Sequence, residues 1–229
     1  MSALHIRAMT RCELDLGIEW AAEEGWNPGL HDADTFHATD PDGFLGAWLN
    51  GEPVGMVSAV HYGAGFGFLG FYIVRPPFRG QGHGLALWQA AMQRFNGRVV
   101  GLDGVVAQQD NYRKSGFELA WNNVRYEGAA RAHAGAVPPS VVPLHELPLQ
   151  AVLDYDAAFF PDDRRTFTRH WLAQRGSTAL AMQRDGRLAG CGVIRPCRVG
   201  HKIGPLFADD TETAELLCHA LMSQVPQGA

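Results

Sequence analysis

The stretch “FYIVRPPFRGQGHGLALW”, residues 71–88, joins an apolar, strand-like run to a helix through a glycine-rich loop. Two prolines end the apolar run, because proline cannot donate a hydrogen bond to a strand ladder. Three alternate glycines follow, and an apolar-periodic segment then predicts a helix over 83–95. The first N–H groups of a helix and the positive end of its dipole favour anions. We therefore interpret residues 79–84 as a candidate phosphate-binding loop.

Two better-known phosphate motifs do not fit this loop. A nucleotide P-loop places lysine and then serine or threonine after its last glycine, whereas Leu85 and Ala86 stand there. The dinucleotide motif G-x-G-x-x-G would need its third glycine at Leu85. The pattern that is present is R-x-x-G-x-G, formed by Arg79, Gly82 and Gly84.

The composition is that of an ordinary globular protein with enough apolar material for a sizeable core. Hydrophobic residues make up 46% of the 229 residues and charged residues 19%. The net charge of −5 argues against a nucleic-acid partner and against an anionic membrane surface. The first residues lack an apolar signal core and no run reaches membrane-spanning length, so we expect a cytoplasmic protein.

The cysteines and histidines follow no metal-binding or disulfide pattern. The four cysteines form no C-x-x-C pair, so we expect reduced and mostly buried thiols. The ten histidines are scattered, without H-x-H or H-x-x-x-H spacing. We therefore expect no metal site.

The pattern of residues 1–128 predicts an α/β domain. Asn50-Gly51 between two apolar runs is a strong hairpin signal within 43–62. On the helix over 83–95, the apolar residues expected to line one face are Leu85, Trp88, Ala91, Met92 and Phe95. The other predicted helices cover 12–25, 31–40 and 108–117, and the other predicted strands cover 5–10, 65–74, 98–106 and 118–128.

A change of composition marks the end of this domain. Residues 129–140, “AARAHAGAVPPS”, are rich in Ala, Gly and Pro, and we interpret them as a linker. Residues 141–229 then repeat the order strand, helix, helix, hairpin, strand, helix of residues 1–95, with a hairpin at Asp185-Gly186. The chain ends at “PQGA” after the last of these helices, so we expect a second domain that is either truncated or incomplete.

The glycine loop and a second segment together resemble a known family. “VRPPFRGQGHG” (74–84) is similar to the pyrophosphate-binding loop V-x-P-x-x-R-G-x-G-x-G of the GNAT superfamily of acyl-CoA N-acyltransferases. “YRKSGF” (112–117) resembles the family's Y-x-K-x-G-F segment on the short helix after the fifth strand. The resemblance covers roughly residues 3–128. “EEGWNPG”, with the repeated architecture, is similar to a tandem-GNAT (YitH-like) group.

The resemblance implies a GNAT fold, which is a mixed, mostly antiparallel sheet flanked by helices, followed here by a degenerate GNAT-like second domain. In this fold the fourth strand splays from the fifth, which implies main-chain contacts of pantetheine with Tyr72, Ile73 and Val74. A bulge amide there would polarise the thioester carbonyl. The implied co-substrate is acetyl-CoA, and its pyrophosphate would contact the residues of the loop: Arg79, Gly80, Gln81, Gly82, His83 and Gly84.

The resemblance also implies direct attack of a primary amine on acetyl-CoA. Tyr112 would be the general acid that protonates the leaving thiolate, and the alternative is that Tyr112 only packs over the cofactor. Many relatives have asparagine at the position of Val105, so one cofactor contact of the family is in doubt here. The general base is left open between a water chain and several side chains: Glu23, Glu24, His31, Asp32, His61 and Asp103.

The acceptor amine is expected to bind between the first two helices and the 61–66 turn. The candidate substrate-binding residues are Trp26, Asn27, Asp32, Phe36 and Asp103. An aromatic ring plus a carboxylate would suit a cationic amine. Core packing is the alternative role for Trp26 and Phe36.

The second domain is expected to bind no acyl-CoA. It lacks R-x-x-G-x-G, and Asp209, Asp210 and Glu212 stand where the phosphate would sit. Carboxylates at that place would repel a pyrophosphate.

Three functions remain open at this point. The leading expectation is an acetyl-CoA-dependent N-acetyltransferase that acts on a small-metabolite amine. The alternatives are a non-catalytic acyl-CoA-binding regulator and a protein or peptide N-acetyltransferase. The intact Tyr112 favours catalysis, and a second domain covering the groove favours a small acceptor. The sequence leaves the acceptor's identity and the oligomeric state open.

Overall fold

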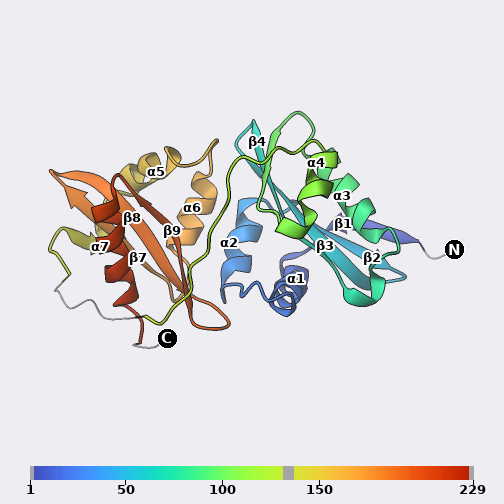
Figure 1. The fold of residues 1–229 in the computed structure, drawn as a ribbon, viewed down its shortest axis with the longest axis horizontal. Coiled ribbons are helices and arrows are strands. Elements are labelled where there is room, and N and C mark those ends of the chain that lie inside the picture. Colours follow the sequence, from blue (N-terminus) through green and yellow to red (C-terminus); the bar gives the residue numbers. More distant parts are fainter. Residues whose placement is uncertain (1–2, 131–136, 227–229) are drawn as a thin grey trace.

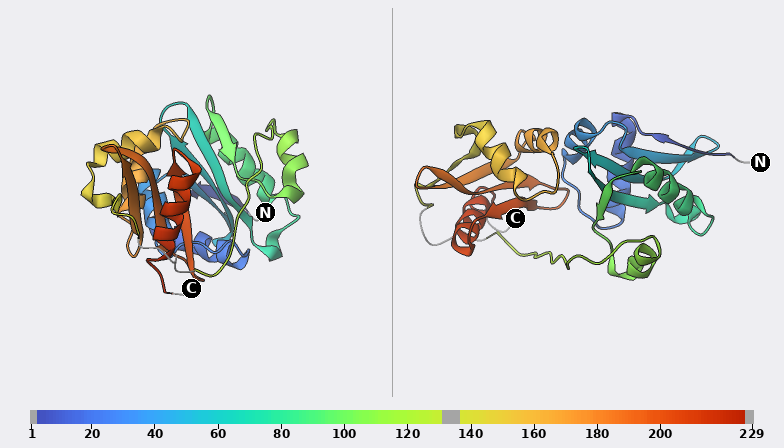
Figure 2. Two further views of the ribbon diagram at one scale, coloured as in Figure 1. Left: turned by 60° about the vertical axis from the view of Figure 1, so that its left-hand side comes forward. Right: turned by 90° about the horizontal axis from the view of Figure 1, so that it is seen from above.

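A computed structural model describes residues 3–130 and 137–226. These residues form two α/β halves that lie side by side, each with its own sheet and helices (Figure 1). An extended segment crosses from the first half to the second (Figure 2). Residues 131–136 of the predicted linker lie outside the described residues.

The first half forms a five-stranded sheet with helices on both faces. In chain order its elements are β1 (Leu4–Ala8), α1 (Arg11–Glu23), α2 (Asp32–Thr39), β2 (Phe44–Leu49), β3 (Glu52–Tyr62), β4 (Phe66–Val74), α3 (His83–Arg94), β5 (Val99–Leu102) and α4 (Gln109–Lys114). The strand order follows the chain, with β1 to β4 antiparallel and β4 parallel to β5. The predicted mixed, mostly antiparallel sheet is therefore confirmed.

Local sequence signals explain where these elements begin and turn. Thr10 forms a capping box at α1. Its hydroxyl accepts a hydrogen bond from the N–H of Glu13 (3.2 Å), and the Glu13 carboxylate accepts one from the N–H of Thr10 (2.8 Å). Asn50 and Gly51 have φ values of 53° and 86°, as a tight turn between β2 and β3 requires. The predicted hairpin is confirmed.

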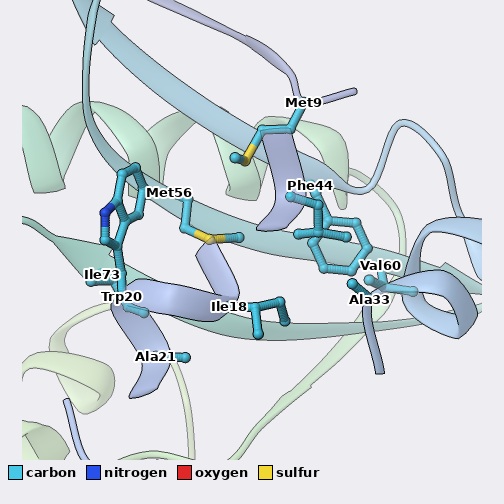
Figure 3. Packing of buried hydrophobic residues seen from close by; sticks show 10 residues of the cluster. Met9, Ile18, Trp20, Ala21, Ala33, Phe44, Met56, Val60 and Ile73 are labelled. Carbon is cyan, nitrogen blue, oxygen red and sulfur yellow. The ribbon is translucent and has the colours of Figure 1, made fainter. Parts of the chain in front are cut away.

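The core of the first half lies on both faces of the sheet. Between the sheet and the α1–α2 pair, a buried cluster (Figure 3) consists of Met9, Leu14, Ile18, Trp20, Ala21, Ala33, Phe44, Met56, Val60 and Ile73. On the other face, α3 buries Leu87, Ala91 and Phe95. The prediction that Leu85 lines this face is wrong, because Leu85 is 60% exposed. Leu87, Ala91 and Phe95 are spaced by four, so they share a face that Leu85 does not.

The predicted last strand of the first domain is absent. Residues 118–128 form no ladder in the described chain, and β5 is shorter than predicted. The alternation of apolar residues indicated a strand, but a period of two does not identify a partner. Four large apolar side chains of this segment are exposed: Leu119, Trp121, Val124 and Tyr126.

The second half repeats the element order from β1 to α3, as predicted. Its elements are β6 (Val141–Pro143), α5 (Leu149–Ala157), α6 (Arg165–Leu172), β7 (Thr178–Arg184), β8 (Arg187–Pro196), β9 (His201–Ala208) and α7 (Thr211–Met222). They form an antiparallel four-stranded sheet in the order β6-β7-β8-β9. Asp185 and Gly186 have φ values of 51° and 73°, which confirms the second hairpin.

The two halves meet through α2 and α6 and through backbone pairing (Figure 1). The N–H of Leu30 donates to the carbonyl of Pro196 (3.1 Å), and the N–H of Arg198 donates to the carbonyl of Pro28 (3.3 Å). The loop after α1 is therefore held by the end of β8.

The segment between α5 and α6 clasps the turn between β3 and β4. The Asp162 carboxylate accepts a hydrogen bond from the N–H of Gly65 (2.7 Å). The ring of Phe160 packs edge-on against Tyr62 and Phe66, with centroids 4.9 and 5.3 Å away. The second half thus covers the 61–66 turn, which was predicted to border the acceptor.

Candidate active site

The glycine loop between β4 and α3 leaves open space at two of its three glycines. Gly80 and Gly82 have φ values of 75° and 86°, a backbone region that L side chains rarely adopt. A Cβ at either position would meet no other atom within 4 Å. Gly84 differs, because a Cβ there would lie 2.8 Å from the hydroxyl of Tyr72. The turn requires the first two glycines, and close packing requires the third.

The start of α3 offers polar groups that an anion would satisfy. Gly82 is the N-cap, and no side chain caps this helix. The first N–H groups of a helix have no partner within it. Nε2 of His83 is buried and has no hydrogen-bond partner among the residues that the structure describes. The loop and helix start therefore fit a pyrophosphate.

Arg79 ties the loop to two neighbouring elements. Its Nε donates to the carbonyl oxygen of Val74 (2.7 Å), and its Nη2 donates to the carboxylate of Glu24. Half of the Arg79 side chain is exposed. Gln81 turns back on the loop, and its amide donates to the carbonyl of Pro77 (3.0 Å). The ion pair joins the glycine loop to the C-cap of α1 and engages Glu24, a candidate base.

β4 carries a bulge where the resemblance places the thioester. The register with β3 shifts so that Phe71 and Tyr72 together oppose Val57. Phe71 has a positive φ of 44°. β5 pairs with β4 as far as Leu69, so the strand edge over 70–74 lies beyond that ladder. β4 and β5 therefore part at the bulge, as the resemblance predicted.

Tyr112 lies on the α3 side of the bulge. Its ring stacks on Trp88 with centroids 6.0 Å apart, and Trp88 also contacts Tyr72 at 5.7 Å. Burial raises the pKa of Tyr112, and a backbone hydrogen bond at Val105 opposes this shift. Burial, and then the proximity of Tyr112, raises the pKa of Tyr72. A phenol with a raised pKa stays protonated at neutral pH, as a general acid must.

Phe71 points to the opposite face of the sheet, where Trp26 and Phe36 lie. Its ring centroid is 6.2 Å from that of Trp26 and 5.7 Å from that of Phe36, both in edge-on geometry. All three side chains are half-buried. We call the side chains of Trp26, Phe36 and Phe71 the aromatic surface. The structure thus brings two of the predicted acceptor residues to the bulge.

Asn27 and Asp32, also predicted to bind the acceptor, are instead engaged by the second half. The Asn27 amide donates to the carbonyl of Val199 (2.9 Å) and accepts from its N–H (3.0 Å). Asp32 is 3% exposed and accepts two hydrogen bonds from Arg195, at 2.8 and 3.1 Å. A backbone N–H and a glutamine amide also donate to this carboxylate. Neither side chain is free to recognise an acceptor.

Two further candidates for the general base, Asp103 and His61, also have other partners. Asp103 is exposed and accepts a hydrogen bond from Asn123 (2.7 Å). His61 Nε2 lies 2.9 Å from the carbonyl oxygen of Arg94, and burial lowers the pKa of this imidazole. Glu23 lies exposed in the last turn of α1, and His31 directly precedes α2. The structure singles out none of them as the base.

Sequence reasoning missed Phe71 and Trp88 as site residues. Trp88 had a signal, because the periodicity placed it on a packed face of α3. Phe71 had none, because its direction depends on a bulge, and no residue type marks a bulge here.

In the second half, the start of α7 is filled by its own carboxylate. Asp210 caps this helix by accepting a hydrogen bond from the N–H of Thr213 (2.8 Å), and it pairs with Arg184 (2.6 Å). These contacts, the bond from Thr213 first, lower the pKa of Asp210 to about 2. The carboxylate uses a donor that a phosphate would need.

Metal-binding and membrane-spanning features were searched in the described part of the chain. Within it, no group of three or more His, Cys, Asp or Glu side chains is placed to hold a metal ion. The four cysteines are free thiols. None of the helices described combines the length and the apolar character needed to cross a bilayer.

Comparisons with known proteins identify relatives of both halves. The acetyltransferase (GNAT) family model matches residues 11–117, and an acetyltransferase (GNAT) domain model matches residues 152–228. A curated relative, holothin acyltransferase from Pseudoalteromonas sp., is 32% identical over 210 residues, which cover 92% of this chain and 71% of that protein.

Solved structures share the fold. A Pyrococcus horikoshii protein assigned to the acetyltransferases has a TM-score of 0.80 and 24% identity. The match covers 99% of this chain and 77% of the Pyrococcus chain. A GCN5-related N-acetyltransferase from Anabaena variabilis has a TM-score of 0.58 and 14% identity, covering 97% of this chain and 63% of its own. The holothin acyltransferase relative is 32% identical over most of both sequences, and GNAT models match both halves. The chain therefore belongs to the GNAT family of acetyltransferases.

Proposed function

We propose that this protein is an N-acetyltransferase that transfers the acetyl group of acetyl-CoA to a primary amine of a small metabolite. The observation that carries the proposal is the bulged edge of β4, next to a glycine loop with open space at Gly80 and Gly82. GNAT proteins generally use an acyl-CoA as co-substrate. Acetyl-CoA supplies an acyl group activated as a thioester, and the residues of this chain bind it, polarise its carbonyl and protonate the leaving thiolate.

Each part of the site has a distinct role in this proposal. The N–H groups of residues 79–84 and the start of α3 bind the pyrophosphate. The main chain of Tyr72, Ile73 and Val74 holds the pantetheine arm along the free strand edge, and the bulge amide polarises the thioester carbonyl. Tyr112, protonated at neutral pH, gives its proton to the thiolate that leaves.

The second half supports a small acceptor. Phe160 and Asp162 cover the 61–66 turn, and Trp171 packs against Phe36 on the acceptor side. A peptide would need an open groove there. The holothin acyltransferase relative is named for one compound. We also propose that the chain falls in the tandem-GNAT (YitH-like) group, because two GNAT models match successive segments.

A thiol-release assay tests the function directly. The full chain is incubated with acetyl-CoA and a panel of small amines and lysine peptides, and free CoA thiol and acetylated product are measured. Turnover with small amines above that with peptides supports the proposal. Acetyl-CoA binding without transfer to any acceptor would indicate a regulator, and a preference for peptides would indicate a protein acetyltransferase.

The variant Gly82→Asp is expected to weaken acetyl-CoA binding at least about tenfold, which corresponds to about 1.4 kcal/mol. The side chain would enter the open space of the loop and add a charge of the same sign as pyrophosphate. Isothermal titration calorimetry measures the change.

A matched control is Gly97→Asp. Gly97 also has a positive φ, 80°, and open space around a Cβ, but it lies between α3 and β5 and outside the loop. Equal affinities of the two variants would remove the loop from the site.

The full chain is expected to bind one acetyl-CoA, because Asp210 occupies the start of α7. The same calorimetric titration gives the stoichiometry. Two binding events per chain, with the second surviving Gly82→Asp, would contradict the assignment of the second half as cofactor-free.

A further inference from the structure

We infer that the acceptor is a weakly basic aromatic amine, held by its ring on the aromatic surface and attacking as the neutral NH₂ form. The inference rests on the proposed function and names the class of amine that this site takes. Its grounds are the rings beside the bulge, the charges around them, the proton balance of the reaction and the second half.

The aromatic surface lies where an acceptor must approach. The bulge turns Tyr72 toward the glycine loop side and Phe71 toward α1 and α2. An acyl group at the bulge is therefore reached from the cofactor side past Tyr72 and from the other side past Phe71. On that other side the rings of Trp26 and Phe36 contact that of Phe71, and all three pack against the buried cluster of the first half. Half-buried rings in edge-on contact offer a flat ligand further aromatic contacts.

The charges around this surface disfavour an ammonium group. The carboxylates of α2 are paired, Asp32 with Arg195 and Asp34 with Arg11. The second half also places a cation here, since Lys202 Nζ donates to the carbonyl of Trp26 (2.7 Å). Asp32, the carboxylate expected to attract a cationic amine, is thus neutralised by Arg195, and Lys202 lies against Trp26 on the same side.

A neutral aromatic amine also balances the protons without a base. The amine nitrogen forms a bond to the acyl carbon and the C–S bond breaks. The nitrogen loses one proton and the thiolate gains one, so amide and free thiol form with no net release. An alkylammonium would first have to lose an additional proton to a base. Of the candidate bases, Glu24, Asp32, His61 and Asp103 are engaged elsewhere, which leaves Glu23, His31 or a water chain to take that proton.

The second half fixes the orientation of the aromatic surface. Trp171 of α6 stacks on Phe36 with centroids 6.0 Å apart at 27°. The guanidinium of Arg195 lies 4.4 Å from the centre of the Trp171 ring while it binds Asp32. Trp171 and Arg195 are therefore positioning residues, which act on the acceptor through Phe36 and Asp32.

The test compares aniline with benzylamine, which carry the same ring but differ in basicity. On the lysine scale an alkylamine is neutral to only about one part in 10³ at neutral pH. Neutral aniline is a weaker nucleophile than neutral benzylamine, which offsets part of the advantage of its larger neutral fraction. We therefore expect kcat/KM for aniline at least to equal that for benzylamine at neutral pH. The value for aniline should stay level across the neutral range, and that for benzylamine should rise about tenfold per pH unit.

Two variants test whether the ring of the acceptor binds on the aromatic surface. Phe36→Leu keeps the apolar volume but removes the flat ring, and it should raise the KM for aniline about 3- to 10-fold with little change in kcat. Phe159→Leu is the matched control, because Phe159 stacks on Phe207 in the second half, outside the surface. Trp26→Leu is the alternative if Phe36→Leu does not fold. Equal KM values for the surface and control variants would overturn the placement.

The possible failures are distinguishable. Turnover that favours benzylamine at every pH would overturn the acceptor class and leave acetyl transfer intact. Transfer to other amines of the panel but to neither of these two would overturn the acceptor class alone. Acetyl-CoA binding with no transfer to any acceptor would contradict the proposed function as well.

Discussion

Replacing Arg195 by methionine is expected to lower the free energy of unfolding by about 3–5 kcal/mol, because it leaves a buried carboxylate without its counter-ion. The Asp32 side chain is 4% exposed and that of Arg195 11% exposed, and two hydrogen bonds join them. Methionine fills much of the volume of the arginine stem, so the lost charge dominates. Urea unfolding of the full chain, followed by tryptophan fluorescence, measures the change.

Two further variants separate the buried charge from packing. Arg184→Met breaks the ion pair between Arg184 and Asp210, whose side chains are 45% and 39% exposed. This variant should lose much less stability, because water replaces the arginine. Adding Asp32→Leu to Arg195→Met should recover part of the lost stability, since an apolar pair can replace a buried ion pair. Recovery is incomplete because Gly29 N–H and the Gln174 amide lose their acceptor. If Arg195→Met is no more destabilising than Arg184→Met, the buried pair does not hold the halves together.

Tyr112→Phe is expected to lower kcat by about 10²–10⁴-fold, the usual contribution of general acid catalysis. The variant keeps the ring that stacks on Trp88 and removes only the hydroxyl. Acetyl-CoA affinity should therefore change little. Steady-state kinetics with a saturating amine, together with calorimetry for acetyl-CoA, separates the two effects.

Tyr126→Phe serves as the control, because Tyr126 is 94% exposed and should be indifferent to the loss of its hydroxyl. If kcat of Tyr112→Phe stays within about threefold of the parent, the reaction does not need this phenol. Tyr112 would then be a packing residue, and water or another side chain would protonate the thiolate.

Local signals in the sequence predicted most of the elements correctly. Asn50-Gly51 and Asp185-Gly186 specify their turns through positive φ values, which these residue types tolerate. The predicted extent of α3 was right, but the prediction that Leu85 is buried was wrong. Ala91 and Phe95 are four residues apart on the buried face, and Leu85 does not fall on this four-residue spacing. These features depend on neighbours close in the chain.

The features that the sequence could not predict depend on partners far away in the chain. Asp32 looked like a ligand for a cationic amine, but its counter-ion Arg195 stands 163 residues later. The alternating residues 118–128 indicated a strand, yet a strand requires an edge to pair with, and the pattern does not name one. The predictions for the loop motif and Tyr112 rest on a contiguous resemblance and not on distant partners.

The backbone pairing between the loop after α1 and the end of β8 has a consequence for motion. A free surface loop moves in nanoseconds to microseconds, whereas rigid-body displacement of a domain takes microseconds to milliseconds. Because Leu30 and Lys202 bond this loop to the second half, it cannot swing aside alone. Under the proposed function, entry and exit past Trp26 are therefore expected to proceed at the pace of the whole second half, which makes product release a candidate for the slowest step of the cycle.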